Sequence, residues 1–412
     1  MKLSTQPYKG TRDFYPEDMR VRNWMFAVIR RVCESYGYEE YDAPVLEPVD
    51  LYLSKTSEEI VNEQSYSFTD RGDRKVIMRP EMTPSVSRMV AARRQELGYP
   101  LRLYNIANFF RYERPQKGRL REFWQLNADI FGVGGIEADV EIIKLADSIM
   151  KALDANPEMY EIRINSKLLL DKRIKESGPK MQLKQVMRLI DGFEKIDKAE
   201  FKNKLADAVE RPEDLYEFLV YDGDTEEIKE IKNRCEKSGI SVKSKYSLAR
   251  GFDYYTDIVF EVFDKNPQNN RSLFGGGRYD GLVGNFGVEP VPTVGFGMGD
   301  VTLLNFLNSN NLVPKLGPAT DVAMLLIGEV NEKAQPFADE LRRLGINVAI
   351  DYEDRKIDKK IKSAVKNNIR FALFVGPDEI SQGIFTLKDL ESGKETKDNI
   401  ENTAKTIRLS RN

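Results

Sequence analysis

The chain has 412 residues, of which 41% are hydrophobic and 31% charged, and its net charge is −3. This length and apolar content fit two or three folded domains, and the near-neutral charge argues against a surface that binds polyanions everywhere. None of the 412 residues is histidine, which excludes serine–histidine and cysteine–histidine catalysis and any histidine-ligated metal centre.

The sequence shows no membrane or export signal. No window approaches the continuous apolar run of a membrane span, and the first residues, MKLSTQPYKGTRDFYP, lack the apolar core of a signal peptide. We therefore expect a cytoplasmic protein with no membrane partner. Cys33 and Cys235 lie far apart in helical stretches and are expected to be buried thiols.

The first predicted elements are a helix and a strand. Residues Pro16 to Tyr36 have amphipathic helical spacing that Gly37 closes, and Glu39 to Leu46 read as a strand carrying Pro44. Because proline cannot donate in a strand ladder, residue patterns alone indicate a surface helix followed by an edge strand.

A second strand enters a helix within residues 76–92. Glu81 and Thr83 lie where this helix begins, close to Pro80 and Pro84. On residue pattern alone, capping of the helix is their natural role.

A hairpin with a basic tip follows. Its strands are Asn108 to Glu113 and Glu122 to Phe131, and the loop Arg114 to Arg121 is rich in cations. Since side chains alternate in a strand, the second strand has an apolar face and a polar face. The apolar face holds Trp124, Leu126, Ala128 and Ile130, and the other holds Phe123, Gln125, Asn127 and Asp129. Such a hairpin is either solvated or built to bind an anionic and a polar ligand together.

The middle of the chain changes character. Residues 139–154 read as a helix and Tyr160 to Asn165 as a strand, after which Ser166 to Lys243 are rich in lysine and glutamate with helical periodicity. This pattern predicts a helical insertion, either solvated or in contact with a ligand.

Strands return at residues 248–263. Ile258, Phe260 and Val262 share one face and are expected in the core, whereas strict alternation puts Arg250 and Tyr255 on opposite faces unless the strand bulges. Gly275 to Gly277 predict a glycine turn close to a ligand. The later GFGMG at 295–299 mimics a dinucleotide-binding loop but lacks that motif's strand, spacing and acidic partner.

After a linker at residues 308–320, strands and helices alternate and predict a small α/β domain. The expected strands are 322–327, 347–351, 371–375 and 383–389, and the expected helices are 332–344 and 359–367. Residues 355–370 are strongly basic, with Asp358 as their acidic residue, and form either a solvated helix face or a phosphate contact.

Several of these stretches resemble a known family. FRYERPQKGR followed by EFWQLNADIFG resembles the second signature motif of class II aminoacyl-tRNA synthetases, specifically of histidyl-tRNA synthetases. LARGFDYYTDIVFE at 248–261 and GGGRYDGL at 275–282 resemble that family's histidine motifs.

The resemblance implies an α+β fold, an antiparallel sheet flanked by helices, with a helical insertion and a C-terminal α/β domain. The implied domains are a catalytic core in two parts (1–165 and 244–315), an insertion (166–243) that approaches the tRNA acceptor stem, and an anticodon-binding domain (321–412). The first helix and the proline-bearing strand are implied to form a homodimer interface.

The implied activity is ATP-dependent ligation of histidine to histidine tRNA through histidyl-adenylate, with Mg²⁺ bridging the phosphates of ATP. The resemblance gives catalytic roles to Arg250, Arg111 and Arg119. It implies ATP binding by Arg111, Glu113, Arg119 and Phe123. It implies histidine binding by Glu81, Thr83, Gln125, Asp129, Tyr254, Tyr255 and Tyr279. It implies tRNA contacts by Arg355, Lys359, Lys360 and Lys362, and no metal held by protein residues alone.

The chain departs from the family at Asp129, where glutamate is common, and at Thr302, where an arginine usually lies over ATP. A different class of function is a catalytically silent regulatory subunit of ATP phosphoribosyltransferase that senses histidine. Such regulators usually lack the arginine-bearing histidine motif and the C-terminal domain, both of which this sequence contains.

Overall fold

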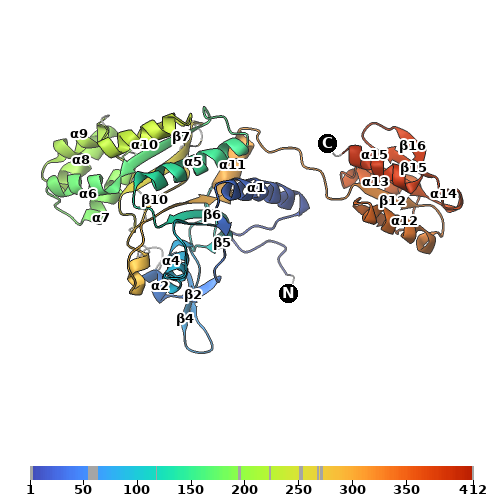
Figure 1. Ribbon diagram of the computed structural model, residues 1–412, viewed down its shortest axis with the longest axis horizontal. Coiled ribbons are helices and arrows are strands. Elements are labelled where there is room, and N and C mark those ends of the chain that lie inside the picture. The colour runs from blue at the N-terminus through green and yellow to red at the C-terminus, as the bar shows by residue number, and fades with distance from the viewer. Residues whose placement is uncertain are drawn as a thin grey trace. The chain divides into compact units, whose positions relative to one another are not determined.

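The computed structural model describes residues 3–53, 64–116, 118–193, 196–221, 224–249, 254–266, 269 and 272–410 (Figure 1). The chain divides into two compact units. One holds residues 1–13 and 24–313, and the other holds residues 14–23 and 314–412.

An 8-stranded sheet organises the first unit, in the order β1-β5-β6-β11-β10-β9-β7-β8. Its edge pairs, β1 with β5 and β7 with β8, are parallel, and every pair between them is antiparallel. The strands are β1 (Glu39–Glu40), β5 (Leu101–Phe110), β6 (Glu122–Phe131), β7 (Tyr160–Ser166), β8 (Val242–Ser244), β9 (Ile258–Asp264), β10 (Ser272–Arg278) and β11 (Thr293–Gly299). The expected antiparallel architecture is confirmed.

Helices cover the apolar face of this sheet. They are α1 (Pro16–Ser35), α5 (Ile136–Ala152), α10 (Glu226–Glu236) and α11 (Asp300–Ser309). Leu126, Ala128 and Ile130 of β6 lie in the core beneath them, as the alternation predicts. Cys33 and Cys235 belong to the same core, and burial raises the pKa of their thiols to about 12 and about 11.

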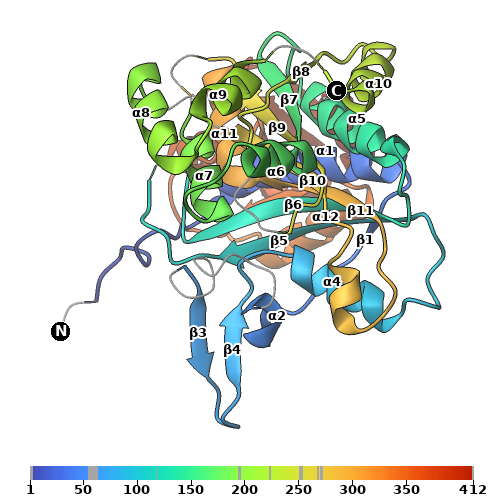
Figure 2. The same cartoon turned by 90° about the vertical axis from the view of Figure 1, so that its left-hand side faces the viewer.

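The first unit also contains a second, 3-stranded sheet. It contains β2 (Leu46–Pro48), β3 (Tyr66–Thr69) and β4 (Lys75–Met78), and the β3–β4 hairpin projects from the unit (Figure 2). Nearby are α2 (Asp50–Leu53), α4 (Thr83–Ala92) and the short helix η1 (Val283–Phe286). The single strand expected at 39–46 is therefore wrong: β1 and β2 belong to different sheets. The segment between them bends around the buried Arg79, whose guanidinium donates to Ala43 O at 2.5 Å and whose backbone N–H donates to Val45 O at 2.9 Å.

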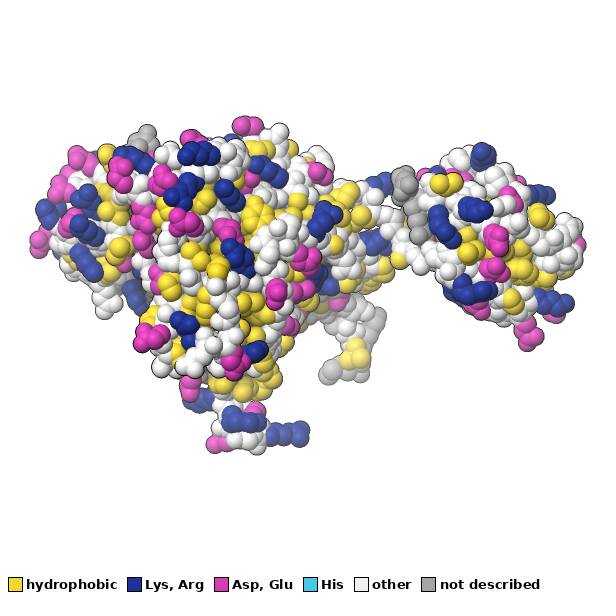
Figure 3. Space-filling view, viewed as in Figure 1, with side chains coloured by type: hydrophobic (Ala, Val, Ile, Leu, Met, Phe, Trp, Pro, Cys, Tyr) yellow, Lys and Arg dark blue, Asp and Glu magenta, His cyan; other side chains and the backbone are white. Residues whose placement is uncertain are grey.

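The insertion is helical, as expected, and most of it has its own core. It contains α6 (Lys167–Glu176), α7 (Leu183–Asp191), α8 (Lys198–Ala208) and α9 (Pro212–Val220). Leu170, Ile174, Phe201, Leu205 and Leu215 are buried among these helices. Cationic and anionic side chains intermingle over this region of the surface (Figure 3).

The strand expected from Leu248 begins only at Ile258, so the alternation argument for Tyr255 does not apply. Tyr254 to Asp257 precede the strand in irregular structure, and residues 250–253, including Arg250, lie outside the described residues. Ile258, Phe260 and Val262 are in the core, as expected.

The second unit contains the expected small α/β domain, a 5-stranded sheet in the order β13-β12-β14-β15-β16. Its strands are β12 (Val322–Leu326), β13 (Val348–Asp351), β14 (Phe371–Val375), β15 (Phe385–Asp389) and β16 (Glu395–Asp398). Its helices are α12 (Asn331–Arg343), α13 (Ile357–Lys366), α14 (Pro377–Gln382) and α15 (Ile400–Leu409). Sequence patterns missed α14, β16 and α15. Across the described parts of both units, no helix has the length and apolar character to cross a membrane.

A buried ion pair ties β10 to α5. The Arg278 guanidinium donates to Asp139, to Val133 O at 3.0 Å and to Gly135 O at 3.0 Å. Both partners are buried, and Asp139 is the buried counter-charge of Arg278, which also lies 3.5 Å from the more exposed Asp280.

We expect Asp139→Ala to lower the free energy of unfolding by about 3 to 5 kcal/mol, because it leaves the Arg278 charge buried without its partner. Chemical denaturation followed by circular dichroism measures this. The control is Glu226→Ala, which removes an exposed partner of Lys229 and should change stability by less than about 1 kcal/mol. Equal losses in the two variants would contradict the assignment.

Candidate active site

A cavity of about 140 Å³ lies over the polar face of β6, β10 and β11. Its lining is formed by Glu81, Thr83, Arg111, Gln125, Asn127, Asp129, Tyr254, Tyr255, Gly275, Tyr279, Gly295, Phe296 and Gly297. The structure thus brings together every residue expected to bind histidine, drawn from segments between residues 81 and 279. The cavity is well below the volume of drug-sized pockets, which suits a single amino acid.

The deep end of the cavity holds a buried carboxyl group. Asp129 is 4% exposed, and the hydroxyl of Tyr279 donates a hydrogen bond to its Oδ1. Burial raises the pKa of Asp129 to about 7, although the bond from Tyr279 acts in the opposite direction. Burial also raises the pKa of Tyr279 well above its ordinary value, so Tyr279 is a neutral donor.

Glycines of β11 make room for the polar row on β6. A Cβ atom at Gly295 would lie 2.0 Å from Asp129 Oδ1, and one at Gly297 would lie 2.5 Å from Gln125 Nε2. Both distances are too short for any side chain. GFGMG lies within strand β11, and Gly295 and Gly297 are part of the pocket wall. Sequence reasoning missed this role, although glycines at every second position opposite a polar row are its signal.

The glycine turn expected at Gly275 to Gly277 is wrong, because these residues lie inside β10. Their lack of side chains serves close packing between strands: a Cβ atom at Gly276 would lie 2.0 Å from Gly295 O. Close backbone approach was the right inference, but the neighbour is β11.

Glu81 and Thr83 line the near end of the cavity. The N-cap of α4 is Met82, so neither residue occupies the capping position that its sequence context suggested. Instead, the hydroxyl of Tyr254 donates to Glu81 Oε2 at 3.0 Å. The hydroxyl of Tyr52 donates to the backbone oxygen of Glu81 at 3.1 Å, which fixes the turn.

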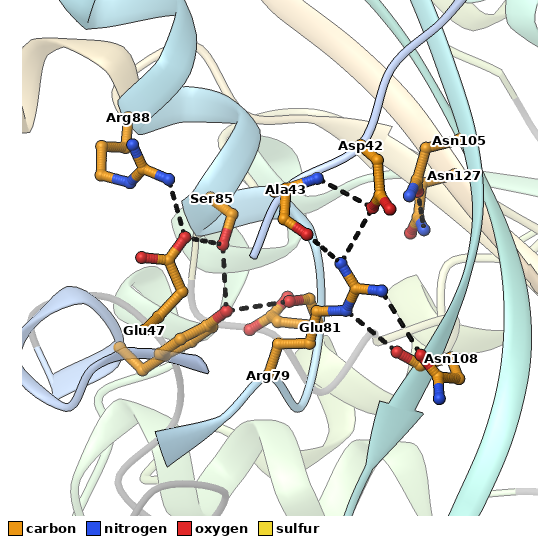
Figure 4. A network of polar contacts seen from close by, with 11 residues as sticks. Asp42, Ala43, Glu47, Arg79, Glu81, Ser85, Arg88, Asn105, Asn108 and Asn127 are labelled. Carbon is orange, nitrogen blue, oxygen red and sulfur yellow. Dashed lines mark hydrogen bonds and ion pairs between the residues drawn. The ribbon is translucent and has the colours of Figure 1, made fainter. Parts of the chain in front are cut away.

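The buried Arg79 holds the same turn against β5 (Figure 4). It donates to Asp42 Oδ1 at 3.0 Å and to Asn108 O at 3.0 Å. The residue after Arg79, Pro80, also contributes: its backbone oxygen accepts a hydrogen bond from Arg111 Nε at 2.9 Å. Arg79 was missed, and its signal was a lone arginine closing the apolar run VIM.

The residues expected to bind ATP lie on β6 and on the segment that connects β5 to β6. Arg111 lines the cavity and lies 5.2 Å from the centre of the Phe123 ring, a cation–π contact. Glu113 lies between two cations, 3.9 Å from Arg111 and 3.5 Å from Arg119. The Arg119 side chain is 61% exposed, so its charge is available at the surface.

Thr302, which occupies the position of the expected arginine, ties α11 to β10. Its Oγ1 donates to Leu273 O at 2.7 Å. This side chain therefore serves packing between the elements.

The residues expected to contact tRNA, which lie in α13 and just before it, differ in exposure. Lys359 and Lys362 are exposed, whereas Lys360 is 5% exposed and its Nζ donates to Leu326 O at 2.9 Å. Lys360 therefore offers no surface charge, and the expectation for it is corrected. Arg355 pairs with Asp351 at 2.7 Å.

Comparison with known proteins agrees with this geometry. The histidyl-tRNA synthetase family model matches residues 10–301, and an anticodon binding domain model matches residues 321–409. A histidine–tRNA ligase from Leptospira biflexa is 42% identical, covering 95% of this chain and 94% of its own.

Solved structures show the same fold. The histidyl-tRNA synthetase from Nostoc sp. PCC 7120 has a TM-score of 0.82 and 24% identity, covering 99% of this chain and 100% of its own. A Bacillus halodurans C protein, described as an ATP phosphoribosyltransferase regulatory subunit/histidyl-tRNA synthetase, has a TM-score of 0.75 and 21% identity, covering 91% of this chain and 99% of its own.

The family match identifies a class II aminoacyl-tRNA synthetase, and the antiparallel sheet with a polar cavity over its central strands agrees with that class. Within that class, the chain belongs to the histidyl-tRNA synthetase family, as the match over residues 10–301 shows.

We expect Asp129→Asn to change how stability depends on pH in the ligand-free protein. The pKa of Asp129 is about 7 when folded, whereas an unfolded aspartate has an ordinary, lower value. Between these values the folded state binds more protons, so stability falls as pH rises from about 4 to about 7. The amide does not titrate and should lack this fall.

Thermal unfolding from pH 5 to pH 8 checks this expectation. The parent should lose on the order of 2 to 4 kcal/mol more than Asp129→Asn over this range. Asp354→Asn, at an exposed carboxylate, should follow the parent. Parallel curves for parent and Asp129→Asn would show that Asp129 is already ionised at pH 5.

Proposed function

We propose that this chain is a histidine–tRNA ligase that activates histidine with ATP to histidyl-adenylate and transfers the histidyl group to the 3′ terminal adenosine of histidine tRNA. The observation that carries the proposal is one small cavity with a carboxyl–phenol pair at its deep end and acceptors for an ammonium at its near end. Membership of the family supports the same reaction.

The deep end suits an imidazole. A neutral imidazole has one nitrogen that donates and one that accepts, so it needs a mixed pair of protein groups. Asp129 is the acceptor and the hydroxyl of Tyr255 is the proposed donor, while Tyr279 holds Asp129 and closes the pocket. The aspartate, shorter than glutamate, keeps its position through Tyr279.

The near end suits the α-ammonium group. Glu81 supplies a carboxylate, and Thr83 and Gln125 supply neutral acceptors within the same lining. Tyr254 fixes the Glu81 carboxylate through its 3.0 Å bond. Charge-assisted bonds of this kind are the stronger hydrogen bonds in proteins.

These contacts leave the substrate carboxylate directed toward Arg111. The carboxylate attacks the α-phosphate of ATP, and pyrophosphate leaves. Because negative charge accumulates there, arginines positioned before the reaction stabilise the transition state. Arg111 and Arg119 are proposed to hold the phosphates, Phe123 to stack on adenine, and Arg250 to contact the α-phosphate and the carboxylate.

Mg²⁺ is proposed to bind with ATP. Within the described residues no cluster of three or more acidic or thiol side chains could hold an ion. Glu113, at 3.5 and 3.9 Å from its arginine partners, offers a carboxylate that fits the usual pattern of one or two carboxylates plus phosphate oxygens. The ion would neutralise phosphate charge.

The tRNA is proposed to contact both units. Residues 1–165 and 244–315 form the proposed catalytic core, 166–243 an insertion near the acceptor stem, and 321–412 the anticodon-binding domain. The anticodon domain match and the exposed lysines of α13 support the last assignment. A homodimer through α1 and the segment after β1, and a cytoplasmic location, are proposed from family membership.

The alternative is a catalytically silent histidine-sensing subunit of ATP phosphoribosyltransferase. The observation behind this alternative is the similarity in fold to the Bacillus halodurans protein. The anticodon binding domain model at residues 321–409 and the match to a histidine–tRNA ligase over 95% of this chain favour the ligase.

Histidine-dependent exchange of pyrophosphate into ATP tests the proposal. The parent should catalyse it, and Gly295→Ala should lose at least about a hundredfold, because the new Cβ would displace Asp129 from its place. Gly98→Ala, where no atom lies within 4 Å of the added Cβ, should retain exchange. A parent that binds histidine but catalyses no exchange would support the sensor instead.

Charging of tRNA tests the second unit. Lys359→Ala combined with Lys362→Ala should weaken tRNA binding and lower its salt dependence by up to about two phosphate contacts, while exchange stays unchanged. The control is Lys333→Ala, an exposed lysine of α12. If the double variant charges tRNA like the parent across a salt series, α13 does not contact the tRNA.

A further inference from the structure

A row of buried amides runs from β5 to the cavity. Gln125 Nε2 donates to Asn127 Oδ1 at 2.6 Å, and Asn127 Nδ2 donates to Asn105 Oδ1 at 2.9 Å. Asn105 and Asn127 are direct cross-strand neighbours on β5 and β6, and their side chains lie together in Figure 4. Asn105 is 1% exposed and Asn127 is 6% exposed, so water does not readily replace these bonds.

The row fixes which end of Gln125 is available to a ligand. Its Nε2 is engaged by Asn127, so Oε1 is the atom left to accept a hydrogen bond in the cavity. Turning the Gln125 amide by itself would set its Oε1 against Asn127 Oδ1, two acceptors without a proton between them.

A concerted turn of the whole row would restore its internal bonds but would present the Gln125 NH₂ group to the cavity. An ammonium ligand rejects that arrangement, because both groups are donors. The observed arrangement keeps both bonds of the row and presents an acceptor to an ammonium, although it leaves Asn105 Nδ2 buried without a partner among the described residues. This step rests on the proposed function, which places the α-ammonium of histidine beside Gln125.

We propose that Asn127 and Asn105 are positioning residues that hold Gln125 with its carbonyl oxygen toward the α-ammonium of the substrate. Neither contacts the reacting atoms. Asn127 acts directly on Gln125, and Asn105 acts through Asn127. Their role is to discriminate between an amino acid and the same imidazole compound without its amino group.

The test compares binding of histidine and of 3-(imidazol-4-yl)propionate, which lacks the ammonium, by calorimetry on the full chain. The parent should prefer histidine strongly. Asn127→Leu should reduce this preference by about 10- to 100-fold, the value of a hydrogen bond to a charged group, with affinity for the propionate changed by less than about threefold.

Matched variants separate positioning from general damage. Asn127→Asp still accepts from Gln125 Nε2. If the Asn105 amide turns, its Nδ2, which is buried without a partner among the described residues, donates to the second carboxylate oxygen, so the preference for histidine should be kept. Leu126→Val disturbs the opposite, core face of the same strand and should leave the preference at the parent value.

Three results overturn the proposal: Asn127→Leu keeps the parent preference, it weakens both ligands equally, or Leu126→Val lowers the preference as much. If Asn127→Leu does not fold, Asn105→Leu replaces it with the same expected direction and the same overturning results. A parent without preference for histidine overturns the proposed function as well, which distinguishes that failure from failure of the amide row alone.

Discussion

The steric room beside β6 is the constraint on which the site depends. Side chains of Gln125 and Asp129 extend over β11. This is possible only because residues 295 and 297 are glycines, since a Cβ atom at either position would lie 2.5 Å or less from one of these side chains. Gly276 has the corresponding role on β10, because its Cβ would lie 2.0 Å from Gly295 O of β11. A sheet that is apolar on one face can therefore carry a polar cavity on the other.

Burial then determines the chemistry of that cavity. A carboxyl group in this position has a pKa raised to about 7, and Tyr279 compensates only part of the cost. Glu81 likewise receives a hydrogen bond from Tyr254, and Asn105 and Asn127 are hydrogen-bonded to each other across β5 and β6. Such networks are rigid when their members are paired, which is what recognition of a small polar ligand requires.

Periodicity predicted much of this structure, because side-chain alternation is local. The two faces of β6 and the core face of β9 follow from it directly. Other features depend on distant contacts that no local pattern encodes. The split of residues 39–48 depends on Arg79, the position of Gly275 to Gly277 depends on pairing with β11, and the burial of Lys360 depends on a carbonyl of β12. The small helix α14 and the last strand and helix were too short or too polar to be predicted.

The pocket that we propose to accept an imidazole contains no histidine, and neither does the rest of the chain. For a ligase that supplies histidine tRNA, this composition removes a dependence: a ribosome can translate these 412 codons without consuming the product of the enzyme. When charged histidine tRNA runs short, ribosomes stall at histidine codons but meet none in these 412 codons. Translation of these codons therefore does not depend on the charged tRNA that is scarce.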